Sequence, residues 1–91
     1  MARLLEDLAP GTPVVDRDGT PVGEVRGLYG LGESRAAEYL LVHWSAREAD
    51  ALVPSTEVAT IGERVELIGS AQTYEMLPAF EPSSNPSLHA L

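Results

Sequence analysis

Short apolar runs, separated by glycine, proline and charged residues, follow one another along most of the chain. The first run ends before Asp18-Gly19, and a second run over residues 21–31 follows this pair. An Asp-Gly pair between two apolar runs is typical of a tight β-hairpin turn, because glycine adopts the left-handed conformation that the turn requires. The pattern therefore predicts an antiparallel pair of strands at the start of the fold.

The second of these strands is predicted to be irregular. It contains the interior glycines Gly23, Gly27 and Gly30, and such glycines weaken a flat sheet but suit the bulges and sharp bends of a barrel. Val22 and Val25 are three positions apart, whereas side chains on one face of a regular strand are two positions apart. A bulge near Gly23 would bring both valines to the core.

The rest of the chain predicts more short strands and one helix. The further strands are expected at residues 38–44, 51–53, 57–61 and 64–68. Ser70 is expected to cap a short helix that runs to Leu77 and ends before Pro78. Frequent turns between short strands favour a barrel over a sandwich. We expect a small all-β barrel with one short C-terminal helix, forming a single domain over residues 1–80, followed by a flexible tail over residues 81–91.

Composition narrows the possible partners. The chain has no cysteine, so disulfides, thiolate metal sites and cysteine nucleophiles are excluded. Its formal net charge of −8 repels phosphate backbones, so no direct binding to nucleic acid is expected. No stretch approaches the roughly 18 apolar residues of a membrane span, and the N-terminus has no apolar signal-peptide core. We expect no membrane insertion and a cytoplasmic location.

The residue patterns provide no catalytic, metal or cofactor site. The two histidines, His43 and His89, are far apart in the sequence and have no cysteine between them, which argues against a zinc site. A calcium loop that began at Asp16 would need glycine at its sixth position and glutamate at its twelfth, but these positions hold Pro21 and Gly27. The chain also has no Gly-x-Ser-x-Gly nucleophile motif. The protein is therefore not expected to be an enzyme.

The strand predicted at residues 38–44 is apolar or aromatic on both faces. Because alternate side chains of a strand point to opposite faces, one face carries Leu40, Val42 and Trp44, and the other carries Tyr39, Leu41 and His43. A small barrel buries only one face of a strand in its own core. The other face would be covered by the C-terminal helix, by a second copy of the chain, or by a different protein.

Tyr29 on the preceding strand extends the same surface. The contact candidates are Tyr29, Tyr39, Leu41, His43 and Trp44, because large amphipathic rings are favoured at protein interfaces. If Leu41 is an exposed contact, Leu41→Glu should abolish association and leave the monomer folded.

Several short motifs along residues 8–80 occur in an order and spacing that resemble the PRC-barrel domain family. They are Gly11 with Val14, Asp18-Gly19, Val22-Gly23-Glu24-Val25, Tyr39-Leu40-Leu41-Val42, Leu52-Val53-Pro54 and Tyr74-Glu75-Met76-Leu77-Pro78. This family includes the barrels of the photosynthetic reaction-centre H subunit and of the ribosome maturation factor. The resemblance implies an open six-stranded barrel that is usually noncatalytic, and it transfers no catalytic residue to this chain.

Taken together, the residues and the resemblance predict a noncatalytic interaction module. It would bind another protein, or associate with itself as a homodimer, through an apolar strand face. The alternative is a ribosome- or RNA-associated assembly factor similar to the barrel half of the ribosome maturation factor. The acidic charge argues against direct contact with RNA, but it would favour docking on a basic ribosomal protein.

Overall fold

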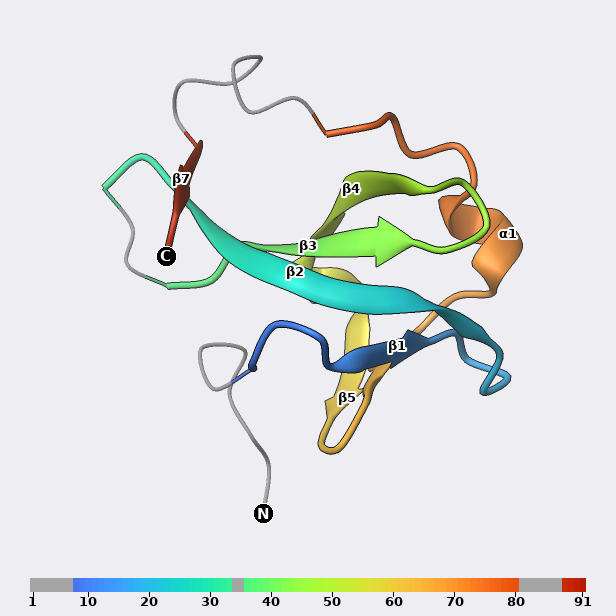
Figure 1. Ribbon diagram of the computed structural model, residues 1–91. Coiled ribbons are helices and arrows are strands. Elements are labelled where there is room, and N and C mark those ends of the chain that lie inside the picture. Colours follow the sequence, from blue (N-terminus) through green and yellow to red (C-terminus); the bar gives the residue numbers. More distant parts are fainter. Residues whose placement is uncertain (1–7, 34–35, 81–87) are drawn as a thin grey trace.

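The computed structural model describes residues 8–33, 36–80 and 88–91, and these residues form a mostly β structure with one short helix (Figure 1). The strands are β1 (Pro13–Val15), β2 (Pro21–Leu31), β3 (Tyr39–Trp44), β4 (Ala49–Pro54), β5 (Val58–Ile61), β6 (Val65–Leu67) and β7 (Leu88–Ala90). The helix is α1 (Ala71–Tyr74), and a 3₁₀ turn, η2 (Ser55–Glu57), links β4 to β5. The predicted all-β class with one short C-terminal helix is confirmed.

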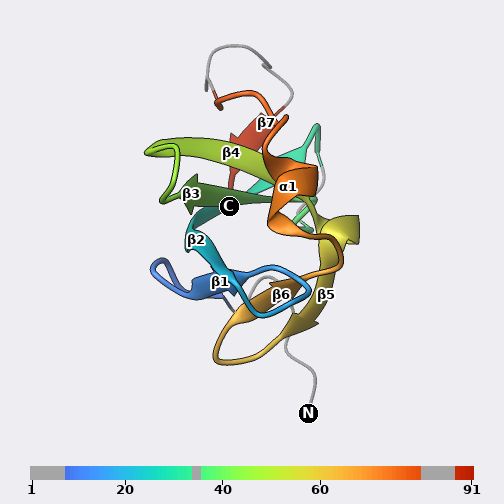
Figure 2. The same ribbon diagram turned by 90° about the vertical axis from the view of Figure 1, so that its right-hand side faces the viewer.

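The strands form one curled sheet in the order β4-β3-β2-β1-β6-β5. Strand β2 pairs with β3 along one edge and with both β1 and β7 along the other. Among the described strands, β1 and β6 form the one parallel pair, and all other pairs are antiparallel. Figure 2 shows β3 and β4 above β1, β5 and β6, with α1 at the end of the molecule that faces the viewer. Because β4 and β5 stand at the two ends of the strand path, the described barrel is open.

Two irregularities bend β2, as its glycines predict. The partners of Val14 and Val15 in β1 are Gly23 and Pro21, so Val22 is an extra residue at this point and forms the expected bulge beside Gly23. A second shift, after Val25, occurs in the pairing with β3. Both Val22 and Val25 are consequently buried. Gly23 is required for close packing, because a Cβ atom there would collide with the backbone carbonyl of His43 on β3.

The core lies inside the curl of the sheet. Strand β3 contributes Leu40, Val42 and Trp44 to the core, which together form one of the two side-chain sets that alternation predicts for this strand. The remaining buried members of the cluster are Val14, Val22, Val25, Ala51, Val53, Val65, Leu67 and Tyr74. Tyr74 belongs to α1, so the helix closes one end of the core with a ring.

Some element boundaries differ from those predicted. Strand β4 begins at Ala49, two residues before the strand expected at residues 51–53, and α1 ends at Tyr74 rather than at Leu77. Ser70 occupies the N-cap position but its side chain makes no capping hydrogen bond. The N–H of Ala71, at the start of α1, instead donates a hydrogen bond to the carboxylate of Asp16. A side chain distant in sequence therefore replaces the local cap.

The sequence analysis missed strand β7. Residues Leu88–Ala90 pair antiparallel with Tyr29–Leu31 of β2, and the N–H of Leu91 donates to the carbonyl of Leu28 at 3.0 Å. Part of the segment expected to be a flexible tail is thus a paired strand, while residues 81–87 lie outside the described residues. Over the described part of the chain, the only helices are short turns, and none could span a bilayer.

Candidate functional site

The structure brings four of the five contact candidates together and separates the fifth. Tyr29 of β2 lies directly opposite Tyr39 of β3 in the register, and Leu41 and His43 follow Tyr39 on the same side of β3. Trp44 points to the other side, belongs to the core and is 5% exposed. Trp44, which was also named as a contact candidate, is therefore a core residue, because its strand position places it on the inner side.

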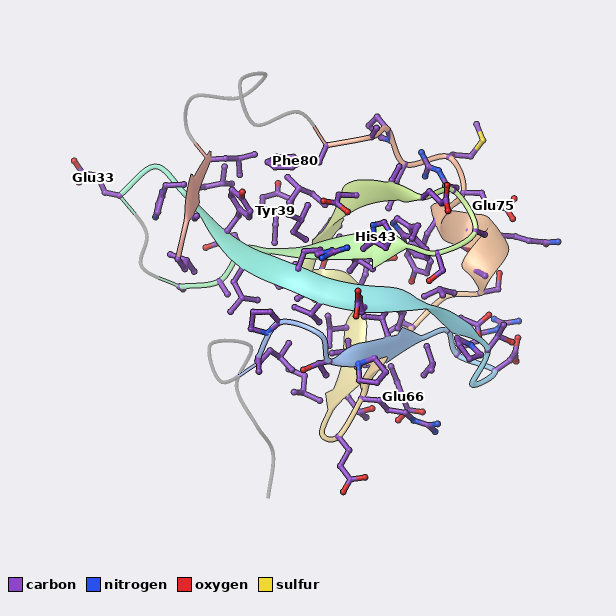
Figure 3. All side chains as sticks on the ribbon, viewed as in Figure 1. Glu33, Tyr39, His43, Glu66, Glu75 and Phe80 are labelled. Carbon is purple, nitrogen blue, oxygen red and sulfur yellow. The ribbon has the colours of Figure 1, made fainter. Side chains whose placement is uncertain are left out.

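We call the outward side of β2, β3 and β4 the outer face. Three rows of register partners form it: Tyr29, Tyr39 and Pro54; Gly27, Leu41 and Leu52; and Glu24, His43 and Asp50. Figure 3 labels Tyr39 and His43 toward opposite ends of β3, with Phe80 close to Tyr39. The first row is aromatic and the third is charged or polar, so the outer face changes in character along the strands.

A segment of the same chain covers the aromatic end of the outer face. The Phe80 ring meets the Tyr29 ring edge-on, with 5.1 Å between ring centroids, and the Phe80 N–H donates to the carbonyl of Asp50 at 2.7 Å. The sequence analysis left open whether the C-terminal helix, a second copy or a different protein covers this face. In the structure the chain itself covers it, through residues that follow α1 and not through α1. Tyr29, Tyr39 and Phe80 all remain partly exposed.

Leu41 does not have the exposure expected of a contact residue. It is only 8% exposed although it lies outside the main core cluster. Placing a carboxylate at this buried position would cost stability. We therefore expect Leu41→Glu to destabilise the monomer, contrary to the expectation from the sequence, and Leu41 supports the outer face as a packing residue.

The polar end of the outer face is held by one side-chain pair. Nδ1 of His43 lies 2.8 Å from Oδ1 of Asp50, its direct neighbour on β4. The side chains are 26% and 39% exposed. Glu24, the partner of His43 on β2, lies 3.8 Å from the guanidinium of Arg26. This end of the surface therefore presents charged groups close to water.

Trp44 instead contributes to a groove at the α1 end of the barrel. The groove has a volume of about 670 Å³ and is lined by Thr20, Pro21, Val22, Trp44, Ser45, Ala46, Arg47, Ala71, Tyr74 and Glu75. The rings of Trp44 and Tyr74 are stacked, with 5.9 Å between centroids and 24° between planes. The sequence analysis did not recognise this groove, because its three walls come from distant parts of the chain.

A buried carboxylate ties two of these walls together. Asp16 is 3% exposed. Its Oδ1 accepts from the N–H groups of Asp18 and Thr20, each at 2.9 Å, and its Oδ2 accepts from the N–H of Ala71 at 3.0 Å. Burial alone would raise the pKa of this carboxyl, but the hydrogen bonds outweigh burial and hold the pKa below its ordinary value of 3.8. Asp16 therefore stays ionised and links the hairpin turn to α1.

Tyr74 fixes α1 from the other side. Its hydroxyl accepts a hydrogen bond from the N–H of Gly69 at 2.9 Å, and Gly69 in turn accepts from the N–H of Arg17 at 3.0 Å. Burial raises the pKa of Tyr74 above its ordinary value of 10.0, so the hydroxyl remains protonated at neutral pH. An aspartate just before an Asp-Gly turn is a local signal for the bonds within the hairpin, but no local signal marks the bond to α1.

Comparison with known proteins leaves the family of this chain open. No family model and no curated protein matches its sequence. Membership of the PRC-barrel family therefore remains a prediction that rests on the resemblance. Within residues 8–33, 36–80 and 88–91, no group of three or more histidine, aspartate or glutamate side chains is arranged to hold a metal ion.

Proposed function

We propose that the protein is a noncatalytic, PRC-barrel-type interaction module of the cytoplasm that binds another protein or a second copy of itself through the outer face. The observation that carries this proposal is the partly exposed aromatic end of that face, where Tyr29 and Tyr39 lie opposite each other beside Phe80. Tyrosine and phenylalanine are enriched in the centres of protein interfaces.

The surroundings of the aromatic end also suit binding. The His43–Asp50 pair and Glu24 give the surface a polar border, and a polar rim around an aromatic centre is the usual arrangement of an interface. The net charge of −8 would steer the protein toward a basic partner. A basic ribosomal protein would be one partner of this kind.

Substitution of Tyr39 tests the proposal. Tyr39→Ser removes an aromatic ring from the surface, and Met76→Ser serves as a control because Met76 is 89% exposed and lies outside the outer face. We expect the unsubstituted protein and Met76→Ser to associate equally, either with themselves in analytical ultracentrifugation or with one discrete partner captured at low salt. Association of Tyr39→Ser should be weaker by about tenfold or more.

The outcomes separate the alternatives. Far-UV circular dichroism and thermal unfolding would first show that Tyr39→Ser is folded. Equal association of the folded Tyr39→Ser variant and the control would overturn the proposal. Salt-sensitive co-sedimentation with ribosomal subunits that Tyr39→Ser abolishes would identify the partner as ribosomal, whereas capture of the protein alone would indicate self-association.

A further inference from the structure

The groove at the α1 end is a second candidate binding site, separate from the outer face. Three segments meet there: the start of β2 at Thr20–Val22, the turn after β3 at Trp44–Arg47, and α1 with Glu75 (Figures 1 and 3). Its volume of about 670 Å³ falls within the range of roughly 300–1,000 Å³ typical of sites for small ligands. The groove is therefore large enough for a side chain together with its backbone groups.

Apolar atoms form much of the lining of the groove. Trp44 and Tyr74, which stack on each other, are 5% and 3% exposed, so each buries most of its surface and leaves only a small part accessible. Pro21, Val22 and Ala46 add further apolar atoms to the walls. A surface of this kind favours an aromatic or branched aliphatic group over a polar one.

Hydrogen bonds hold the walls in place. The Asp16 carboxylate joins the hairpin turn to Ala71 at the start of α1, and the N–H of Ser45 donates to the carbonyl of Val22 at 3.1 Å. Each wall is thus connected to a neighbour either by a backbone hydrogen bond or by the short side chain of Asp16, and not by a long flexible side chain. A preorganised groove loses little conformational entropy when it binds a ligand.

The polar side chains of the groove differ in what a ligand can reach. The indole N–H of Trp44 is buried and has no hydrogen-bond partner among the described residues, which is uncommon for a buried polar group. Arg47 is exposed, and within the described part of the chain its guanidinium makes no ion pair. The buried indole N–H is closed to a ligand, whereas the exposed Arg47 would gain from one that brings a carboxylate.

Glu75 further restricts which polar groups a ligand of the groove can carry. It lines the α1 side of the groove, whereas Arg47 lies on the turn after β3. The lining therefore offers a cation on one wall and an anion on the other. A ligand with a carboxylate at one position and an N–H donor at another complements this pair of charges, and an amino acid unit has both groups next to its side chain.

We propose that the groove binds an apolar α-amino acid unit with a free carboxylate. The side chain lies against Trp44 and Tyr74, the carboxylate pairs with Arg47, and the N–H of the ligand faces Glu75. Such a unit is either a free amino acid derivative or the C-terminal residue of a peptide.

Trp44 itself provides the measurement, because it is the only tryptophan of the chain. Its fluorescence and its single indole N–H cross-peak in a ¹H–¹⁵N NMR spectrum both report on the groove. The probes are N-acetylphenylalanine, its carboxamide, N-acetylglycine, and an acetylated tetrapeptide that ends in phenylalanine with a free carboxylate. We expect N-acetylphenylalanine to cause saturable changes in both signals, and the carboxamide and N-acetylglycine to bind at least about tenfold more weakly.

A pair of arginine variants provides the control. Arg47→Gln should weaken binding of N-acetylphenylalanine by about tenfold or more. Arg64→Gln removes the same charge from an exposed side chain that does not line the groove, so it should bind as the unsubstituted protein does. Binding of the tetrapeptide comparable to that of N-acetylphenylalanine would identify a peptide C-terminus as the natural ligand, and much weaker binding would identify a free amino acid derivative.

Two results would overturn the inference. One is the lack of a saturable response to any of the four probes. The other is a response that neither Arg47→Gln nor replacement of the carboxylate by the carboxamide alters. These titrations are independent of the outer face, because Tyr39 does not line the groove. Tyr39→Ser should leave them unchanged, so failure here is distinguishable from failure of the proposed interaction module.

Discussion

The outer face and the groove are held together in different ways. The outer face consists of neighbouring strands in register, and Phe80 covers it through a ring contact with Tyr29 and a backbone hydrogen bond to Asp50. The groove joins three distant segments, tied by the Asp16 carboxylate and closed by the buried ring of Tyr74. Loss of the Phe80 contacts would uncover the first region at little cost, whereas the second cannot change shape without disturbing the core.

Substitution of two adjacent leucines should give the largest effect that distinguishes the core from the outer face. Leu40 is fully buried in the core cluster, whereas Leu41 belongs to the outer face and is 8% exposed. Leu40→Ala should lower the free energy of unfolding by about 3 kcal/mol, since the surrounding core cannot collapse into the cavity. Leu41→Ala should cost less, about 2 kcal/mol, because Leu41 lies on the outer side of the sheet, where the site can collapse more readily than in the core.

Urea denaturation of both variants measures this difference. The two substitutions remove the same atoms from neighbouring positions of one strand, so each is the control for the other. Equal losses would mean that the outer face is packed as tightly as the core. The contrast between the two regions would then be wrong.

The next test concerns the hydrogen bonds that the Asp16 carboxylate accepts, which connect two walls of the groove. Asp16→Asn should lower the melting temperature at pH 7 by about 5–10 °C, because an amide cannot reproduce all three hydrogen bonds that the carboxylate accepts from backbone N–H groups. Asp18→Asn is the control, since Asp18 is exposed and takes part in these bonds only through its backbone. A similar fall in melting temperature in both variants would show that the loss of a negative charge, and not the loss of the Asp16 hydrogen bonds, destabilises the protein.

The pH dependence of the same variant has a defined sign. The folded-state pKa of Asp16 lies below its ordinary value of 3.8. Its stabilising effect is therefore fully present above pH 3.8 and is lost as the pH falls through the lower folded-state pKa. The difference in melting temperature between the unsubstituted protein and Asp16→Asn should be constant near neutral pH and shrink in acid. A difference that grows in acid would contradict this assignment.

Local patterns were sufficient to predict much of the fold. The Asp18-Gly19 turn, the bulge beside Gly23 and the separation of β3 into two side-chain sets all depend on residues that are close in sequence. Alternation could not decide which set faces the core, because both sets are apolar or aromatic. Which set faces the core depends on the direction in which the whole sheet curls, and this direction places Trp44 in the core.

The parts of both regions that the sequence did not predict depend on long-range contacts. Phe80 covers Tyr29, and Asp16 bonds to Ala71 across 55 positions. Neither contact leaves a periodic signal in its own segment. Strand β7 has only three residues, too few for alternation to distinguish it from a tail. The strand predictions were therefore more accurate than the prediction of the candidate site.

The smallest expected effect comes from the cover of the outer face. Phe80→Ala should lower the free energy of unfolding by about 1 kcal/mol, since the ring is only partly buried and makes one ring contact. The emission of Trp44 should stay unchanged, because Phe80 does not line the groove. Urea denaturation followed by tryptophan fluorescence measures both quantities, with Met76→Ala as the exposed control. A shift in Trp44 emission of the native Phe80→Ala variant would show that the cover and the groove are coupled, and the two regions could then no longer be treated as independent binding surfaces.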